Sequence, residues 1–168
     1  MAIRVGSRIP YVEFLTMGRD GPLLITSEEV FRGRSVVLFA VPGAFTPSCH
    51  YVHMPCYLDE YETLRRAGVD TIACTAVNDP FVLDVWAQAT GAKDKILFLA
   101  DGNGDFVEAM DLPFDGRHLG LGSRSRRYAL WAFDGVVRVL NIERDPTKAE
   151  VTTAYAMLRM FETWNAAP

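Results

Sequence analysis

Cysteine is scarce in this sequence of 168 residues, which contains three: Cys49, Cys56 and Cys74. A secreted scaffold held by disulfides normally carries an even and denser set of cysteines, so the sequence does not fit that class. The first residues have no apolar core of the kind found in a signal peptide. The longest apolar run, 36–41, ends at Pro42 and is much too short to cross a bilayer. We therefore expect a cytoplasmic protein, not bound to a membrane, whose thiols are free at rest.

Positive charge is not in excess either. The chain has 17 basic and 21 acidic side chains, a formal net charge of −4. This balance gives no electrostatic reason to expect a nucleic acid as partner. Internal repeats, low-complexity tracts and Pro- or Ser-rich linkers are lacking as well, and the length suits one compact domain. We predict a single globular domain over residues 1–168.

The apolar runs that are present predict an α/β fold. Ser35 to Val41 is apolar without alternation, which is typical of a strand covered on both faces. Further strands are expected at 71–77, 96–100, 128–133 and 136–142, and helices at 49–66, 80–90 and 147–161. The dipeptide Asp134-Gly135 favours a tight turn, so the last two strands should form a hairpin. This order predicts a three-layer sandwich with parallel strands in the middle of the sheet and an antiparallel pair at one edge.

The segment from Pro42 to Cys49 joins the expected strand at 35–41 to the helix at 49–66 and carries most of the chemical signal. Cys49 falls in the first turn of that helix, where free backbone N–H groups and the positive end of the dipole favour the thiolate. The thiolate is the reactive form, so this position activates the sulfur without a separate base. Thr46 can turn its hydroxyl toward the same pocket or serve as the helix N-cap. Pro55 should kink the helix because it removes one backbone donor.

The spacing Pro-x-x-x-Thr-x-x-Cys at 42–49 resembles the active-site motif of peroxiredoxins, and the string 41–49 (VPGAFTPSC) resembles their type II, or peroxiredoxin 5, subfamily. The similarity continues at 53–55, 77–82 and 122–128 and so extends over almost the whole chain. The resemblance implies a thioredoxin-like fold with peroxiredoxin additions, in which helices flank a central mixed sheet. It also implies a thiol peroxidase that reduces hydrogen peroxide and small organic hydroperoxides without a metal or other cofactor.

The same resemblance implies roles for four residues. Cys49 would be the peroxidatic cysteine, which attacks the O–O bond of the peroxide and becomes a sulfenic acid. Thr46 would orient the peroxide, and Pro42 would shield the sulfenate. Arg124 would place a guanidinium close to the sulfur, where it favours the thiolate and binds the oxygens as charge shifts in the transition state.

Without the resemblance, Arg124, Arg126 and Arg127 indicate a solvated basic turn. Strand alternation places Arg127 on the side opposite the other two, although the loop before the strand weakens that argument. The resemblance further implies a homodimer, with the aromatic side chains of Phe45 and Phe81 as candidates for the interface.

The chain departs from the family in its other cysteines. Some relatives carry a resolving cysteine after the hairpin, and this sequence has no cysteine beyond Cys74. Cys74 falls within an apolar strand and is expected to be a buried core thiol. Cys56 stands where the family usually has glycine. On an ideal helix Cys49 and Cys56 are about 10 Å apart, which is too far for a disulfide unless the first turn unwinds.

We therefore expect a one-cysteine mechanism, with Cys56 and Cys74 as less favoured resolving residues. An external thiol would reduce the sulfenic acid, either glutathione with glutaredoxin or a thioredoxin. Two alternatives stay open. Cys49, His53 and Cys56 share a helix face and could ligate a soft metal such as zinc, although their geometry is poor and no fourth ligand is evident. Oxidised Cys49 could also signal to a partner, which would make the protein a non-enzymatic peroxide sensor.

Overall fold

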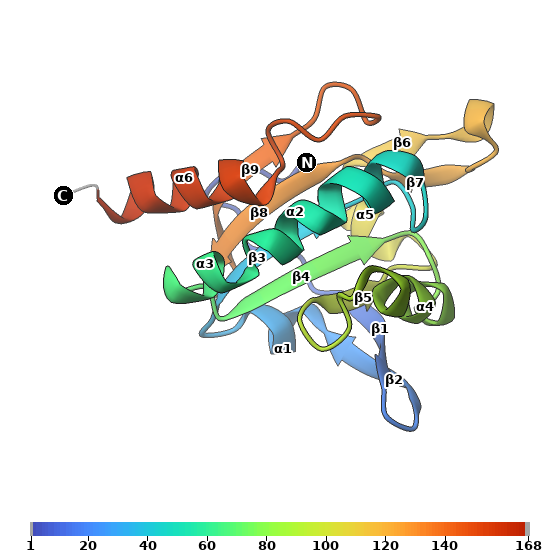
Figure 1. Ribbon diagram of the computed structural model, residues 1–168, viewed down its shortest axis with the longest axis horizontal. Coiled ribbons are helices and arrows are strands. Elements are labelled where there is room, and N and C mark those ends of the chain that lie inside the picture. The colour runs from blue at the N-terminus through green and yellow to red at the C-terminus, as the bar shows by residue number, and fades with distance from the viewer. Residues whose placement is uncertain (1, 167–168) are drawn as a thin grey trace.

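A seven-stranded sheet organises the fold in the computed structural model, which describes residues 2–166. Its strand order is β2-β1-β5-β4-β3-β8-β9 (Figure 1). The strands are β1 (Glu13–Gly18), β2 (Gly21–Thr26), β3 (Ser35–Ala40), β4 (Thr71–Ala76), β5 (Leu97–Ala100), β8 (Tyr128–Phe133) and β9 (Val136–Ile142). Strands β3, β4 and β5 are parallel, as predicted. The β8–β9 hairpin is the expected antiparallel pair at one edge, and β1 with β2 forms a second such pair at the other edge.

Helices cover both faces of this sheet. They are α1 (Ser27–Phe31), α2 (Met54–Asp59), α3 (Tyr61–Arg66), α4 (Pro80–Thr90), α5 (Asp105–Met110) and α6 (Ala154–Asn165). The core on one face contains residues of α2, α3, α4 and α6, and the core on the other face contains residues of α1 and α5 (Figure 1). Val37 and Phe39 of β3 belong to the first core, and Val36 and Leu38 belong to the second. The expected α/β class with a mixed central sheet is thus confirmed.

The segment after β3 differs from a simple kinked helix. A π-helical turn, η1 (Cys49–His53), precedes α2, and the Met54 amide donates to the Cys49 carbonyl five residues earlier. Pro55 is the second residue of α2. Because proline has no N–H and its ring crowds the carbonyl four residues back, it disfavours regular α-helical hydrogen bonds over the preceding turn. The helix is interrupted instead at Glu60, between α2 and α3.

The last helix begins later than the sequence predicts. Helix α6 starts at Ala154, and its N-cap is Thr153, whose hydroxyl accepts a hydrogen bond from the Ala156 amide. The predicted start at Thr147 is therefore wrong, because residues 147–153 form an irregular segment held by contacts outside the helix. Among residues 2–166, no helix is long and apolar enough to cross a membrane.

Three short elements between β5 and β8 were not predicted. They are α5, the two-stranded sheet of β6 (Pro113–Asp115) with β7 (Ser123–Ser125), and the 3-10 turn η2 (Arg117–Leu119). The Asp101 carboxylate lies at the start of α5 and accepts hydrogen bonds from the Phe106 and Val107 amides of its first turn. Strand β7 leads directly to Arg126 and Arg127, which precede β8.

Candidate active site

The loop after β3 holds Cys49 in a fixed and enclosed position. The Cys49 side chain is fully buried. The Ala44 amide donates to the Asn78 side chain at 3.0 Å, and the Thr46 hydroxyl donates to the Gly43 carbonyl at 2.8 Å. Phe45 has a φ of 63°, a left-handed conformation that costs energy for a residue with a bulky side chain. The loop is therefore a constrained turn that presents Thr46 and Cys49 together.

Arg127 lies against the sulfur of Cys49. Its Nη2 donates to Sγ at 3.2 Å, and the guanidinium is fastened by two further acceptors. Nε and Nη2 both donate to the Pro146 carbonyl, at 3.1 and 3.0 Å, and Nη1 contacts Nδ1 of His53 at 2.9 Å. The side chain is 1% exposed. Cys49 thus faces a buried cation that is also held by Pro146 and His53.

Within residues 2–166 the charge of Arg127 has no carboxylate partner, because the ion pairs found there all involve other residues. Arginine does not deprotonate in proteins, and a buried charge without a counter-ion is costly. The structure therefore places a buried cation without a carboxylate partner directly against the Cys49 sulfur.

His53 is the neutral partner of Arg127. Its Nδ1 lies 2.9 Å from Nη1 of Arg127, which can only donate, so Nδ1 accepts and Nε2 carries the proton. Nε2 then donates to the Thr152 carbonyl at 3.0 Å. Burial, together with the positive charge of Arg127, lowers the pKa of His53 from its usual 6.5 to about 3. The imidazole therefore stays uncharged at neutral pH. It accepts a hydrogen bond from the guanidinium and adds no second positive charge beside it.

Arg124 does not occupy the position that the sequence analysis gave it. Its Nη1 donates to the Pro42 carbonyl at 3.3 Å, and its Nε donates to the Leu121 carbonyl at 2.8 Å. Gly43 allows this approach, since a Cβ there would stand 2.8 Å from Nη1. Arg124 therefore braces the loop, whereas Arg127 supplies the guanidinium at the sulfur. The placement of Arg124 beside Cys49 was wrong.

Strand alternation contained the signal for Arg127. Ala129 and Trp131 of β8 belong to the same core as Cys49, and Tyr128 and Leu130 belong to the core on the opposite face. Counting back from Ala129 by two places Arg127 on the Cys49 side of the sheet. The count holds because Arg127 directly precedes β8.

A mostly apolar cavity of about 270 Å³ opens beside this site. Thr46 and Arg127 line it, together with Pro42, Pro47, Ser48, Phe114, Leu119, Leu121, Pro146 and Thr147. Cys49 does not line the cavity, but Arg127, which does, contacts its sulfur. Pro42 is buried next to the loop.

The other two thiols have different surroundings. Cys56 donates to the His53 carbonyl at 3.0 Å and accepts from the Ala154 amide at 3.4 Å, and burial raises its pKa to about 11. Cys74 is fully buried in β4, and burial raises its pKa well above the usual value. All three cysteines are free thiols in this structure.

The structure does not assemble the metal site considered above. Both ring nitrogens of His53 are engaged, by Arg127 and Thr152, and the Cys56 thiol contacts backbone groups. Within the described part of the chain, no group of three His, Cys, Asp or Glu side chains could hold a metal ion.

The fold and site define a class: a thioredoxin-fold protein with one buried thiol at the start of a helical segment, in contact with a guanidinium. A family model described as Redoxin matches residues 4–158. The chain is 42% identical over 146 residues to Peroxiredoxin-2E, chloroplastic, of Arabidopsis thaliana, which covers 84% of this chain and 62% of that protein. The crystal structure of reduced Prx3 from Vibrio vulnificus in complex with H2O2 is 40% identical, with a TM-score of 0.89 over 95% of this chain and 99% of that one.

A third relative is itself named as a peroxiredoxin 5. Peroxiredoxin 5 from Alvinella pompejana is 37% identical and superimposes with a TM-score of 0.83 over 96% of this chain and 99% of that one. The chain belongs to the redoxin family, as a peroxiredoxin of the type II, peroxiredoxin 5-like group. It spans less than two thirds of the length of the plant relative named above.

Proposed function

We propose that the protein is a thiol peroxidase that reduces hydrogen peroxide and small organic hydroperoxides. The observation that carries the proposal is the contact of 3.2 Å between Nη2 of Arg127 and Sγ of Cys49, made by a buried cation without a carboxylate partner in the described chain. The family membership and the H2O2 complex of a 40% identical relative support the same substrate class.

In the first step the Cys49 thiolate attacks the terminal oxygen of the peroxide. An S–O bond forms while the O–O bond breaks, so Cys49 is oxidised to a sulfenic acid. The leaving oxygen takes up a proton and departs as water or an alcohol. The Thr46 hydroxyl already donates to Gly43, so its lone pairs can accept from the peroxide O–H. Arg127 keeps one N–H of Nη1 for a peroxide oxygen, because its other contacts use the remaining four.

Reduction of the sulfenic acid is the second half of the cycle. We propose that an external thiol attacks Cys49, releases water and forms a mixed disulfide, which a second thiol then resolves. Glutathione with glutaredoxin, or a thioredoxin, would supply these thiols. Cys56 is a weak candidate for the resolving role because its raised pKa keeps it a thiol at neutral pH, and the thiolate is the attacking form. No metal or prosthetic group is needed in either step.

The peroxidase proposal is tested with three single variants. Cys49→Ser should abolish peroxide consumption in the presence of excess dithiothreitol, whereas Cys56→Ser and Cys74→Ser should retain it. Sustained turnover by the wild type also separates an enzyme from a peroxide sensor, which would consume one equivalent and stop. Peroxidase activity in Cys49→Ser would remove the basis of the proposal.

We also propose that the protein acts as a homodimer in the cytoplasm. Phe45 and Phe81 are exposed by 47% and 62%, and the hydrogen bond from Ala44 to Asn78 brings their two segments together next to the active-site loop. Exposed aromatic side chains are enriched in protein interfaces. Sedimentation of the wild type and of Phe81→Asp tests this, with a shift from dimer to monomer expected in the variant. The free thiols are the reason to expect a reducing compartment.

A further inference from the structure

The irregular segment between β9 and α6, residues 144–153, reaches the active site through two carbonyl groups. The Pro146 carbonyl accepts from Nε and Nη2 of Arg127. The Thr152 carbonyl accepts from Nε2 of His53 at 3.0 Å and from the Tyr57 hydroxyl at 2.8 Å. The orientation of both Arg127 and His53 therefore depends on the conformation of this segment, which is neither helix nor strand.

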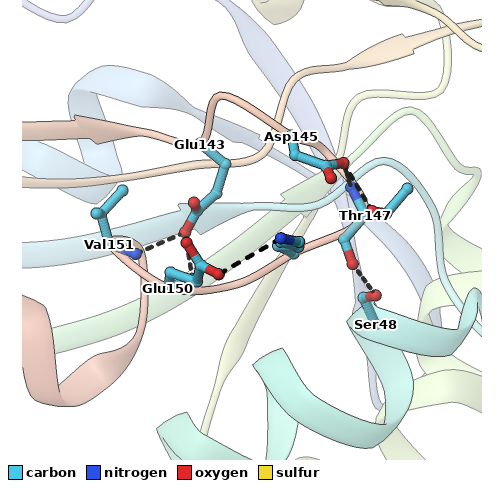
Figure 2. A network of polar contacts seen from close by, with 7 residues as sticks. Ser48, Glu143, Asp145, Thr147, Glu150 and Val151 are labelled. Atoms are coloured by element: carbon cyan, nitrogen blue, oxygen red, sulfur yellow. Dashed lines mark hydrogen bonds and ion pairs between the residues drawn. The ribbon is translucent and has the colours of Figure 1, made fainter.

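The carboxylate of Glu143 holds the segment in that conformation. Its Oε1 accepts from the amides of Glu150, Val151 and Thr152 at 2.6, 2.8 and 2.9 Å. The Thr152 hydroxyl adds a fourth donor at 2.9 Å. Figure 2 shows Glu143, the residue after β9, with the Val151 amide directed at its carboxylate. These four hydrogen bonds join residues 150–152 to Glu143, which is 5% exposed, and so close the segment into a loop.

The other end of the segment is fixed by smaller contacts. The Asp145 carboxylate accepts from the amide and hydroxyl of Thr147, and the Thr147 carbonyl accepts from the Ser48 hydroxyl, next to Cys49 (Figure 2). The backbone of Glu143 contributes as well. Its amide donates to the Arg127 carbonyl at 3.0 Å, and its carbonyl accepts from Nη2 of Arg126 at 3.2 Å. Glu143 thus contacts the backbone of Arg127 and the side chain of Arg126, the residue before it.

The roles of the two buried charges are separate. Within residues 2–166, neither Glu143 nor Arg127 forms an ion pair. The negative charge of Glu143 is satisfied by amide and hydroxyl donors, which bind carboxylates more strongly than neutral acceptors. The positive charge of Arg127 is left for the sulfur.

We propose that Glu143 is a positioning residue of the peroxidase site: by gathering the amides of residues 150–152, it fixes the Pro146 and Thr152 carbonyls that orient Arg127 and His53 toward Cys49. The proposal rests on the proposed function of Cys49 and adds a residue sixteen positions beyond the arginine it supports. Glu143 touches neither sulfur nor peroxide, so its effect reaches the reaction only through Arg127 and His53.

The test uses Glu143→Gln, with Glu150→Ala as the matched control. Glutamine keeps the size of the side chain and an oxygen acceptor but loses the charge that strengthens the four hydrogen bonds. Glu150 is an exposed glutamate of the same segment whose side chain contacts Lys148 at 3.9 Å. The readouts are the second-order rate constant with hydrogen peroxide and the pH at which the Cys49 thiolate forms, followed by absorbance at 240 nm with Cys49→Ser as the blank.

We expect Glu143→Gln to slow the peroxide step about 10-fold, as is typical when a group that orients an active-site ligand is removed. Thiolate formation should move to higher pH in parallel, and Glu150→Ala should match the wild type in both. The direction of the pH shift is decisive. If Glu143 acted only as a nearby negative charge, its neutralisation would move thiolate formation to lower pH. A shift to lower pH, or no change in either readout, would overturn the proposal.

Two further arms cover the remaining outcomes. If Glu143→Gln does not fold, Thr152→Val removes one of the four donors and should give a smaller change in the same direction, and no change there would overturn the proposal. In an Arg127→Lys background the effect of Glu143→Gln should largely disappear, because both act on the same guanidinium. If the wild type proves to consume no peroxide, the proposed function fails, and the thiolate titration still decides whether Glu143 positions Arg127.

Discussion

Two thiols on one helical segment, Cys49 and Cys56, have opposite surroundings. Both pack on the same face of the sheet, where Cys49 is fully buried and Cys56 is half-buried. The Cys49 sulfur accepts from a buried guanidinium, whereas the Cys56 thiol contacts the His53 carbonyl and the Ala154 amide. Burial alone disfavours a thiolate, as the raised pKa of Cys56 shows. The two thiols therefore differ in what they contact: a guanidinium faces Cys49, whereas neutral backbone groups face Cys56.

Removal of the Arg127 guanidinium should remove most of the reactivity expected of Cys49. Arg127→Ala is expected to lower the second-order rate constant with hydrogen peroxide by 100-fold or more, roughly 3 kcal/mol, as for the loss of a donor to a developing charge. Arg127→Lys should recover part of it, since lysine restores the charge without the two-pronged contact to Pro146. Stopped-flow measurement of sulfenic acid formation gives the rate constants.

Arg124→Ala is the control for that experiment. Arg124 braces the loop through the Pro42 carbonyl and makes no contact with the sulfur, so its loss should cost clearly less than the loss of Arg127. Equal losses in the two variants would show that the contact at 3.2 Å does not explain the reactivity.

His53 lies between the two cysteines in the chain. Its ring contacts Arg127, and its carbonyl accepts a hydrogen bond from the Cys56 thiol. Its pKa is about 3 in the folded protein and 6.5 ordinarily, so between these values the unfolded chain binds a proton that the folded chain does not. Stability must therefore fall as the pH falls below 6.5. From pH 7 to pH 5 the contribution of this one group is about 2 kcal/mol.

Urea unfolding at the two pH values, for the wild type and His53→Asn, measures this contribution. The variant keeps an acceptor for Arg127 but has no titrating group, so its stability should depend less on pH. The same pH dependence in both proteins would mean that His53 is not buried in its neutral form.

Thr46 forms hydrogen bonds with Gly43 and His50, on either side of Cys49 in the chain, so it should affect Cys49 and not Cys56. Thr46→Val removes the hydroxyl that can accept from the peroxide and keeps the shape of the side chain. We expect about a 10-fold loss of rate, equivalent to about 1.4 kcal/mol, with the pH of thiolate formation unchanged. A loss of rate accompanied by a shift in thiolate formation would assign Thr46 to the thiolate instead of the peroxide.

Cys56 should give the smallest effect. Cys56→Ser replaces a half-buried thiol that makes two contacts with backbone groups, and a hydroxyl can make the same contacts. We expect an unfolding free energy within about 1 kcal/mol of the wild type and an unchanged rate with dithiothreitol as reductant. A large loss of turnover in this variant would make Cys56 the resolving cysteine and would break the contrast with Cys49.

The sequence revealed the parts of this site that are local in the chain. Pro42, Thr46 and Cys49 fall within eight residues, after a strand whose apolar run marks it as buried. The parallel centre of the sheet followed from the same kind of run. Arg127 required one step more, because three arginines within four residues can be separated only by counting strand alternation from the middle of β8.

The segment at 144–153 could not be predicted from periodicity. Its apolar residues continue the spacing of α6, which is why the helix seemed to begin at Thr147. The segment stays irregular because the Glu143 carboxylate takes the amides of residues 150–152, and because Thr153 caps the helix that follows. Contacts between residues seven to nine positions apart, made by one side chain, leave no repeating mark in a sequence.

The most direct test of the account is mass spectrometry of the reduced protein after one equivalent of hydrogen peroxide, with dimedone present to trap sulfenic acid. We predict a single dimedone adduct, located on Cys49, with Cys56 and Cys74 unmodified. An adduct on Cys56, or the loss of two hydrogens in a peptide pair that links Cys49 to Cys56, would contradict it.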